Sequence, residues 1–200
     1  MLVIYDLEFT TWDGAQSRGW TGPGEFREIV QIGALRVVPD TLVVDAEFEI
    51  LVKPSRNPDV SDFFAALTGI DRSAVEQRGT DFLTALNAFL DFCDGSYALS
   101  YGNDMVVIGE NIVLQIPEGR APARPLPPFV NIRPHLNAIL PATAQLAAGS
   151  LSRGLTEAAG LGPTEAGEVE PIHDALLDCR SILEALRYLR KLGHPLFCLQ

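Results

Sequence analysis

The sequence predicts an α/β fold, a sheet flanked by helices, from three observations. Short β-branched and apolar segments at residues 2–7 and 29–38 are typical of buried strands. Apolar residues recur at helical spacing from 82 to 93 and again from 179 to 189. Strands and helices alternate through the second half of the chain, which favours helices on the faces of the sheet. Two hundred residues suit one domain, so we expect residues 1–200 to form a single unit.

The first half of the chain predicts three strands before any helix. A strand over Leu2–Leu7 leads through a glycine-rich loop into a second strand, Ile29–Val38, whose continuous apolar character indicates that both its faces are covered. From Ala46 to Val52 apolar and acidic residues alternate, as in a half-exposed edge strand. We therefore expect the third strand to lie at an edge of the sheet.

Helices are predicted to follow these strands. Ser61–Thr68 predicts a short helix closed by Gly69, and Thr80 is expected to cap a longer helix that ends before Gly95. The remaining predicted elements are a strand at 97–100, a helix at 104–116, a proline-rich connection at 117–128, a strand at 129–132, a helix ending near Pro141, a short helix at 151–159 and a last helix ended by Gly193.

Composition excludes some classes of protein. No apolar run is long enough for a membrane helix, and the first residues lack the features of a secretory signal. The three cysteines, Cys93, Cys179 and Cys198, are widely spaced, which favours small packing residues in a reducing cytoplasm over disulfides or structural zinc. The net charge of −11 argues against broad electrostatic attraction to nucleic acid.

Asp6 and Glu8 lie at the end of an otherwise apolar strand. Their spacing of two places both side chains on the same face of the sheet. Adjacent like charges repel and burial raises that cost, so a bound cation explains the pair. Oxygen ligands of this kind suit magnesium or manganese. A strand end that runs into solvent would also tolerate two acids, and this motif alone does not separate the two interpretations.

His173 and Asp178 lie five residues apart in a segment that leads into the last predicted helix. Five residues rotate the chain by about 140° along a helix, so the two side chains cannot share a face if both are helical. We therefore expect His173 on the loop before the helix and Asp178 within its first turns. The alternative has Asp174 as the helix cap and Asp178 as an exposed charge.

Asp104 follows a strand and a glycine turn and opens a predicted helix. Aspartate is a common helix cap, so in isolation this residue has a structural explanation. It becomes a candidate for function only in combination with the other carboxylates.

Together these motifs resemble the DEDDh 3′→5′ exonucleases, the superfamily of RNase T and the proofreading exonucleases. The resemblance is nearest to the Eri-type exoribonucleases and the bacterial KapD-like proteins. It rests on Asp6-Leu-Glu8, on the segment around Asp104, and on His173-x-Ala-x-x-Asp178, whose histidine distinguishes this branch from the tyrosine-bearing one. Further similar segments, in the family's order, are 6–12, 28–34, 61–70, 129–133 and 151–155.

The resemblance implies a ribonuclease H-like fold, with a five-stranded mixed sheet whose second strand runs antiparallel. It also implies two divalent cations, Mg²⁺ or Mn²⁺. Asp6 would bridge both, Glu8 and Asp178 would hold the nucleophile-side ion, and Asp104 would help to hold the other. His173 would be the general base, which suits its pKa near neutrality. The implied reaction is hydrolysis of single-stranded RNA or DNA at the 3′ end to nucleoside 5′-monophosphates, with RNA favoured by the Eri-type segments.

The same resemblance indicates substrate-binding candidates next to the first motif and on the short helix that borders the terminal-base pocket in relatives. Phe9 is bulkier than the residue often found after D-x-E, which predicts a narrower pocket, and core packing is the alternative for the helix residues. The candidates are Phe9, Thr10, Ser61, Phe64 and Leu67.

Two other functions stay open. A DNA exonuclease of the repair type would use the same catalytic residues. A non-catalytic nucleic-acid-binding or scaffolding protein would lack one of the carboxylates or the histidine, although all five are present. Two bound divalent ions would reduce the net charge to about −7, which still opposes long-range attraction to a polyanion. We therefore also expect that a homodimer or a protein partner could supply basic contacts.

Overall fold

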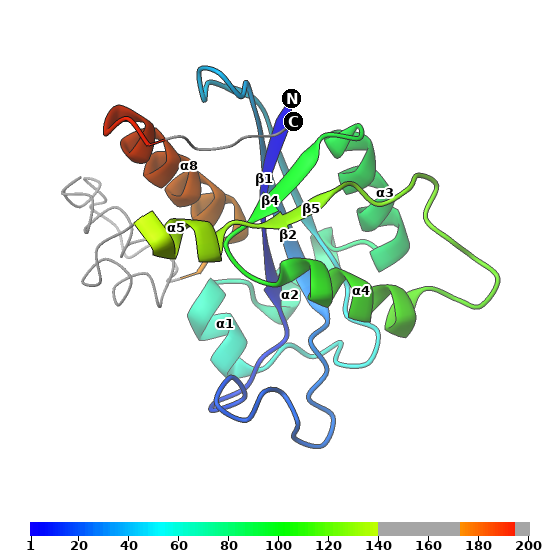
Figure 1. Ribbon diagram of the computed structural model, residues 1–200. Helices are drawn as coiled ribbons and strands as arrows, with labels where there is room; N and C mark the ends of the chain where they lie inside the picture. The colour runs from blue at the N-terminus through cyan, green and yellow to red at the C-terminus, as the bar shows by residue number, and fades with distance from the viewer. Residues whose placement is uncertain (140–172, 195–200) are drawn as a thin grey trace.

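The computed structural model describes residues 1–139 and 173–194 and contains one five-stranded sheet in the order β3-β2-β1-β4-β5 (Figure 1). β2 runs antiparallel to both β1 and β3, whereas β4 is parallel to β1 and β5 is parallel to β4. The predicted mixed sheet with an antiparallel second strand, and with it the ribonuclease H-like fold, is confirmed. The strands are β1 (Leu2–Phe9), β2 (Ile29–Val37), β3 (Val44–Leu51), β4 (Tyr97–Ser100) and β5 (Phe129–Asn131).

Helices cover both faces of this sheet, with α3 and α4 on one side and α5 and α8 on the other (Figure 1). Within the part of the chain that the structure describes, no helix is long and apolar enough to cross a membrane. The helices are α1 (Asp62–Thr68), α2 (Arg72–Arg78), α3 (Phe82–Cys93), α4 (Asp104–Gln115), α5 (Arg133–Ile139) and α8 (Ala175–Lys191).

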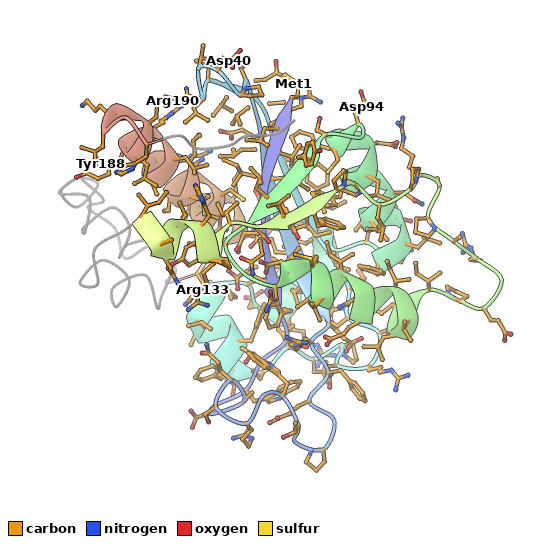
Figure 2. All side chains as sticks on the ribbon, viewed as in Figure 1. Met1, Asp40, Asp94, Arg133, Tyr188 and Arg190 are labelled. Carbon is orange, nitrogen blue, oxygen red and sulfur yellow. The ribbon has the colours of Figure 1, made fainter. Side chains whose placement is uncertain are left out.

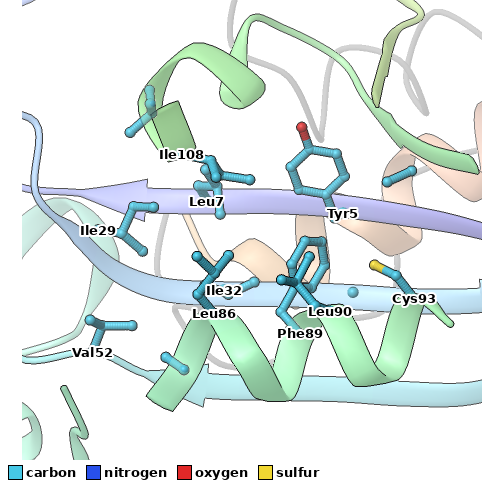
Figure 3. Packing of buried hydrophobic residues seen from close by; sticks show 14 of the residues in the cluster. Tyr5, Leu7, Ile29, Ile32, Val52, Leu86, Phe89, Leu90, Cys93 and Ile108 are labelled. Atoms are coloured by element: carbon cyan, nitrogen blue, oxygen red, sulfur yellow. The ribbon is translucent and has the colours of Figure 1, made fainter. Parts of the chain in front are cut away.

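β1 is the central strand and is buried on both faces. Its side chains alternate: Leu2 and Ile4 pack in the core beneath α8, whereas Tyr5 and Leu7 pack against α3 and α4. Figure 3 shows the α3 side, where Tyr5 lies close to Phe89. Each large apolar side chain buried in this way contributes about 1.5–3 kcal/mol. The alternation also means that even-numbered residues of β1 face α8.

β3 is an edge strand, as its sequence predicts, with half-buried apolar residues alternating with exposed ones. β2 is almost wholly buried, which confirms the interpretation of its continuous apolar run. Cys93 and Cys179 are buried and unpaired, as expected. The predicted helix at 151–159 and Cys198 lie outside the described residues.

Two features of the middle of the chain differ from prediction. α2 was not expected, because its seven residues include only one buried side chain, Val75, and so carry no apolar periodicity. α3 is capped by Asp81, whose carboxylate accepts a hydrogen bond from the backbone N–H of Thr84. Thr80, the predicted cap, instead forms a backbone bridge to Val52. Both residues favour N-caps, so composition alone could not choose between them.

Candidate active site

The first two carboxylates come from the buried end of β1. Asp6 and Glu8 are each 8% exposed and, as even-numbered residues of this strand, lie on the face covered by α8. The prediction that they share a face is confirmed, and burial removes the interpretation of a strand end running into solvent. In the neighbouring strand β2, Asp6 is opposite Gly33 and Glu8 is opposite Gln31.

Gly33 allows α8 to approach the sheet at the level of Asp6. A Cβ atom at this position would lie 2.4 Å from the backbone nitrogen of Leu176 and 2.5 Å from the carbonyl carbon of Ala175. Cys179 Sγ lies 3.3 Å from the carbonyl oxygen of Gly33, to which the thiol donates. Since any side chain at 33 would push the helix away, the glycine determines how closely α8 carries its carboxylate to β1.

Gln31 holds the first turn of α8 in place. Its side-chain oxygen accepts a hydrogen bond from the backbone N–H of Ala175 at 3.0 Å, and its amide nitrogen donates to Asp174 and to Glu49, each also at 3.0 Å. Asp174 in turn caps α8 by accepting from the backbone N–H of Leu177 at 2.9 Å. The capping role considered for Asp174 is therefore real, and the orientation of the helix start is fixed by side chains from two strands.

Asp178 lies in the first turn of α8 and is 4% exposed, so it is not a surface charge. His173 lies just before the helix, as predicted, and its backbone N–H donates to the carbonyl of Leu67 in α1 at 3.1 Å. His173 Nδ1 is 3.8 Å from Asp178 Oδ2. Glu8, His173 and Asp178 each offer a ligand atom, and these atoms all lie within 4.8 Å of one another.

Asp104 is the first residue of α4, and Asn103 occupies the N-cap position without a side-chain capping bond. Because β1 and β4 are parallel neighbours, the end of β4 brings the start of α4 to the same edge of the sheet as Asp6 and Glu8. Asp104 lines the same pocket as Asp6, Glu8, His173 and Asp178. The structure therefore brings together all five residues predicted to be catalytic.

Burial and mutual repulsion make this cluster unfavourable for negative charge. Burial is the largest cause of the raised pKa of Asp6, followed by repulsion from Asp104, Asp178 and Glu8. Burial also raises the pKa of Glu8, with repulsion from the neighbouring acids adding to it, and burial raises the pKa of Asp104. The pKa of His173 is lowered by burial, which favours the neutral imidazole.

This donor set fits divalent cations. Buried carboxylates are rarely grouped unless a positive charge compensates them. The raised pKa values of Asp6 and Glu8 indicate that the protein's own groups do not compensate the negative charge of the cluster. The donors are carboxylate oxygens with one nearby imidazole, which suits hard ions such as Mg²⁺ or Mn²⁺.

A pocket of about 510 Å³ opens over the cluster, between β1, the loop that follows it and α1. Two of the predicted substrate-binding residues, Phe9 and Leu67, line it. Trp12 and Phe63 add aromatic walls, and Phe63 is 41% exposed. The pocket therefore places aromatic and aliphatic side chains next to the carboxylates.

The other three predicted substrate-binding residues have structural contacts instead. The hydroxyl of Thr10 accepts from the backbone N–H of Glu28, and this residue is 1% exposed. Ser61 caps α1 and donates to the carbonyl of Thr11. Phe64 is fully buried in the core beneath α1.

For two of these three residues, the neighbour in sequence lines the pocket instead. Thr11 and Phe63 line the pocket where Thr10 and Phe64 were expected. The sequence contains two adjacent phenylalanines and two adjacent threonines, so the residue type alone could not show which one faces the pocket. Arg133 also lines the pocket.

Comparison with known proteins agrees with this geometry. The family model of the RNase T exonucleases matches residues 3–186. Human ERI1 exoribonuclease 2 is 29% identical over 76 residues, which is 38% of this chain but only 10% of the human protein.

Two solved structures have the same fold. The crystal structure of a full-length 3′-exonuclease has a TM-score of 0.72 at 22% identity, over 96% of this chain and 82% of that one. The nuclease domain of 3′hExo, a DEDDh family member bound to rAMP, has a TM-score of 0.71 at 22% identity, over 98% and 94% of the two chains. The family model, which spans nearly the whole sequence, supplies the assignment: this chain belongs to the RNase T family of exonucleases.

Proposed function

We propose that this chain is a metal-dependent 3′→5′ exonuclease that releases nucleoside 5′-monophosphates from single-stranded nucleic acid, with RNA as the preferred substrate. The observation that carries this proposal is the convergence of Glu8, His173 and Asp178, whose ligand atoms lie within 4.8 Å of one another in a buried acidic cluster. A pocket of about 510 Å³ with aromatic walls adjoins this cluster and is suited to a terminal nucleotide.

The four carboxylates Asp6, Glu8, Asp104 and Asp178 would hold two divalent cations, Mg²⁺ or Mn²⁺, with Asp6 as the shared ligand. When bound, such ions lower the pKa of water and stabilise the charge on the leaving 3′-oxygen. Burial, and then repulsion between the acids, raises the pKa of Asp6 and Glu8. Bound cations would stabilise the charged carboxylates against both effects, so the cluster favours cation binding.

His173 would remove a proton from the attacking water as general base. Its side chain is 29% exposed, so the imidazole can reach solvent, and its burial lowers the pKa and keeps the ring ready to accept a proton near pH 7. The hydrogen bond from its backbone to Leu67 links the base to α1, which also carries a wall of the pocket. The base and the terminal nucleotide would thus be positioned by the same helix.

The preference for RNA is supported by the similarity to a human exoribonuclease and to a nuclease domain bound to rAMP. A DNA exonuclease would use the same five catalytic residues, since the difference lies in contacts to the 2′-hydroxyl. A non-catalytic nucleic-acid-binding protein is less well supported, because none of the five is missing or displaced from the cluster.

A digestion of matched 5′-labelled RNA and DNA strands tests the proposal. With Mn²⁺ we expect a ladder that shortens from the 3′ end, faster for RNA, and its loss both in EDTA and in the Asp178→Ala variant. Faster digestion of DNA would select the repair-type alternative. A folded, metal-loaded protein that digests neither strand would contradict the catalytic proposal.

We further propose that residues 1–200 act as one exonuclease domain in the cytoplasm, where the unpaired thiols of Cys93 and Cys179 would remain reduced. The net charge of −11 supports the additional proposal of a homodimer or a protein partner that supplies basic contacts. Light scattering, with and without a single-stranded oligonucleotide, distinguishes a monomer from a dimer.

A further inference from the structure

We propose that Arg133 binds the backbone phosphate immediately 5′ of the scissile one and so guides the incoming strand into the active site. This inference rests on the proposed nuclease function and adds to it a phosphate-binding site for the nucleotide that follows the one being removed. Figure 2 shows Arg133 at the start of α5, between α5 and α1 in that view.

The position of Arg133 is tied to the metal-binding edge of the sheet. Its backbone N–H donates to Asn131 Oδ1 at 3.0 Å, and the amide nitrogen of Asn131 donates to Asn103 Oδ1 at 2.8 Å. Asn103 is the N-cap of α4 and directly precedes Asp104. Two consecutive hydrogen bonds therefore connect the start of α5 to the start of α4, which bears one of the acidic ligands.

The charges around the pocket leave one place for a further phosphate. Its described lining contains four clustered carboxylates, and Arg133 is the one arginine or lysine among those lining residues. The scissile phosphate would be neutralised by the bound cations, but the next phosphate along the strand would lie near the same carboxylates without such compensation. Arg133 is the residue of the described lining that can compensate it, in a protein whose net charge is −11.

Arg133 has no carboxylate partner among the described residues. Its guanidinium lies over the ring of Tyr101, 5.6 Å from the ring centroid, and Tyr101 is buried and donates its hydroxyl to Asn137 Oδ1 at 3.3 Å. Stacking of this kind holds the guanidinium plane while leaving its N–H edges available for a bidentate phosphate contact. By contrast, carboxylates pair with Arg18, Arg27, Arg36, Arg72, Arg124, Arg180 and Arg187.

The test compares two substrates that differ in whether an upstream phosphate exists. The p-nitrophenyl ester of uridine 5′-monophosphate contains only the scissile phosphate, whereas a ten-residue oligouridylate ends in the same nucleotide and carries the whole backbone. For Arg133→Ala we expect the ratio of oligonucleotide to ester kcat/KM to fall about tenfold or more, the effect of one charge-assisted contact. Arg133→Lys should recover part of it, because lysine keeps the charge but not the planar fork.

Arg124→Ala is the matched control. Arg124 is exposed like Arg133, but it pairs with Asp91 and Asp94 and does not line the pocket, so its loss should leave the ratio at the wild-type value. Dependence on salt provides a second measure: the slope of log kcat/KM against log salt should decrease by about 0.7 in Arg133→Ala, as for one lost phosphate contact on a single strand. Arg124→Ala should not change that slope.

Replacing single phosphates by neutral methylphosphonates identifies the one that is bound. At the phosphate 5′ of the scissile one, the replacement should slow the wild-type enzyme about tenfold and the Arg133→Ala enzyme by less than twofold. Equal loss on both substrates, or a full methylphosphonate penalty in the variant, would overturn the assignment of Arg133 alone. A wild-type protein inactive on both substrates would overturn the nuclease proposal as well.

Discussion

The fold contains two buried acidic regions that solve the same physical problem differently. Glu28, just before β2, is fully buried and its carboxylate accepts five hydrogen bonds, from the backbone and side chains of residues 55–57. Asp6 and Glu8, at the end of β1, are nearly as buried but are surrounded by other carboxylates, which helps to raise the pKa of both. A hydrogen bond from the backbone of Leu7 lowers the pKa of Asp6, but burial and repulsion from the neighbouring acids outweigh it.

This difference separates a structural acid from a functional one. N–H donors from a loop compensate the charge of Glu28, so this residue joins the loop to the sheet and needs nothing from outside the protein. The donors around Asp6 and Glu8 do not offset their burial and mutual repulsion, and in the proposed function divalent cations would compensate this charge. Burial alone therefore does not distinguish the two regions, whereas the grouping of several buried carboxylates does.

The largest effect that this comparison predicts is the loss of activity in Asp6→Asn. The amide keeps the size of the side chain but removes the shared ligand, so kcat should fall about a thousandfold, equivalent to several kcal/mol of transition-state stabilisation. Steady-state hydrolysis in saturating Mn²⁺ measures this, with circular dichroism to verify the fold. Activity within tenfold of the wild type would remove Asp6 from the metal site.

Glu28→Gln should act on stability instead of on catalysis. The amide cannot accept all five hydrogen bonds, and the buried donors left unpaired should reduce the free energy of unfolding by about 2 kcal/mol. Urea denaturation measures the loss. Glu47→Gln is the matched control, because Glu47 forms an exposed ion pair with Arg180 at 2.8 Å and should change stability by less than about 0.5 kcal/mol. Equal losses in both variants would contradict the structural role of Glu28.

The smallest expected effect is a pH dependence of the metal-free protein. The folded pKa of Asp6 and Glu8 is raised above the ordinary values of 3.8 and 4.5, so the folded state binds more protons than the unfolded state in the window above those values. Their contribution to stability is present below that window and is lost as the pH rises through the folded pKa. In EDTA, the free energy of unfolding should decrease over this range, and less steeply in Asp6→Asn.

In EDTA, the less steep decrease should leave Asp6→Asn more stable than the wild type at high pH. Saturating Mn²⁺ should make the wild type the more stable protein, because only the wild type keeps all its proposed metal ligands. Parallel curves for the wild type and Asp6→Asn in EDTA would show that the cluster is already compensated within the protein.

Much of the fold and the catalytic set could be predicted because the responsible signals are local. The alternation in β1 placed Asp6 and Glu8 on one face, and the five-residue spacing placed His173 before α8 and Asp178 within it. These predictions use only the period of the strand and of the helix. Such predictions are reliable where a strand or helix is regular and buried on a defined face.

The remaining features depend on partners distant in sequence. Gly33 has no local sign of its role, because the contact that excludes a side chain there comes from α8, more than a hundred residues later. Glu28 likewise finds its donors on a loop whose course the sequence does not reveal. Phe64 was predicted to bind substrate, but Phe64 is buried and Phe63 lines the pocket. The sequence could not distinguish them for the same reason, because the side of α1 that packs on the sheet decides which ring is buried.

The packing of α8 against Gly33 has a consequence during synthesis of the protein, because α8 lies near the end of the described chain. Synthesis proceeds from the N-terminus, so Asp6 and Glu8 leave the ribosome long before the segment that carries His173 and Asp178. A nascent chain that has not yet reached this segment lacks both the proposed general base and the last proposed acidic ligand. On the proposed mechanism, a nascent chain or a fragment that ends before α8 would fold without an active site and would leave nucleic acid intact.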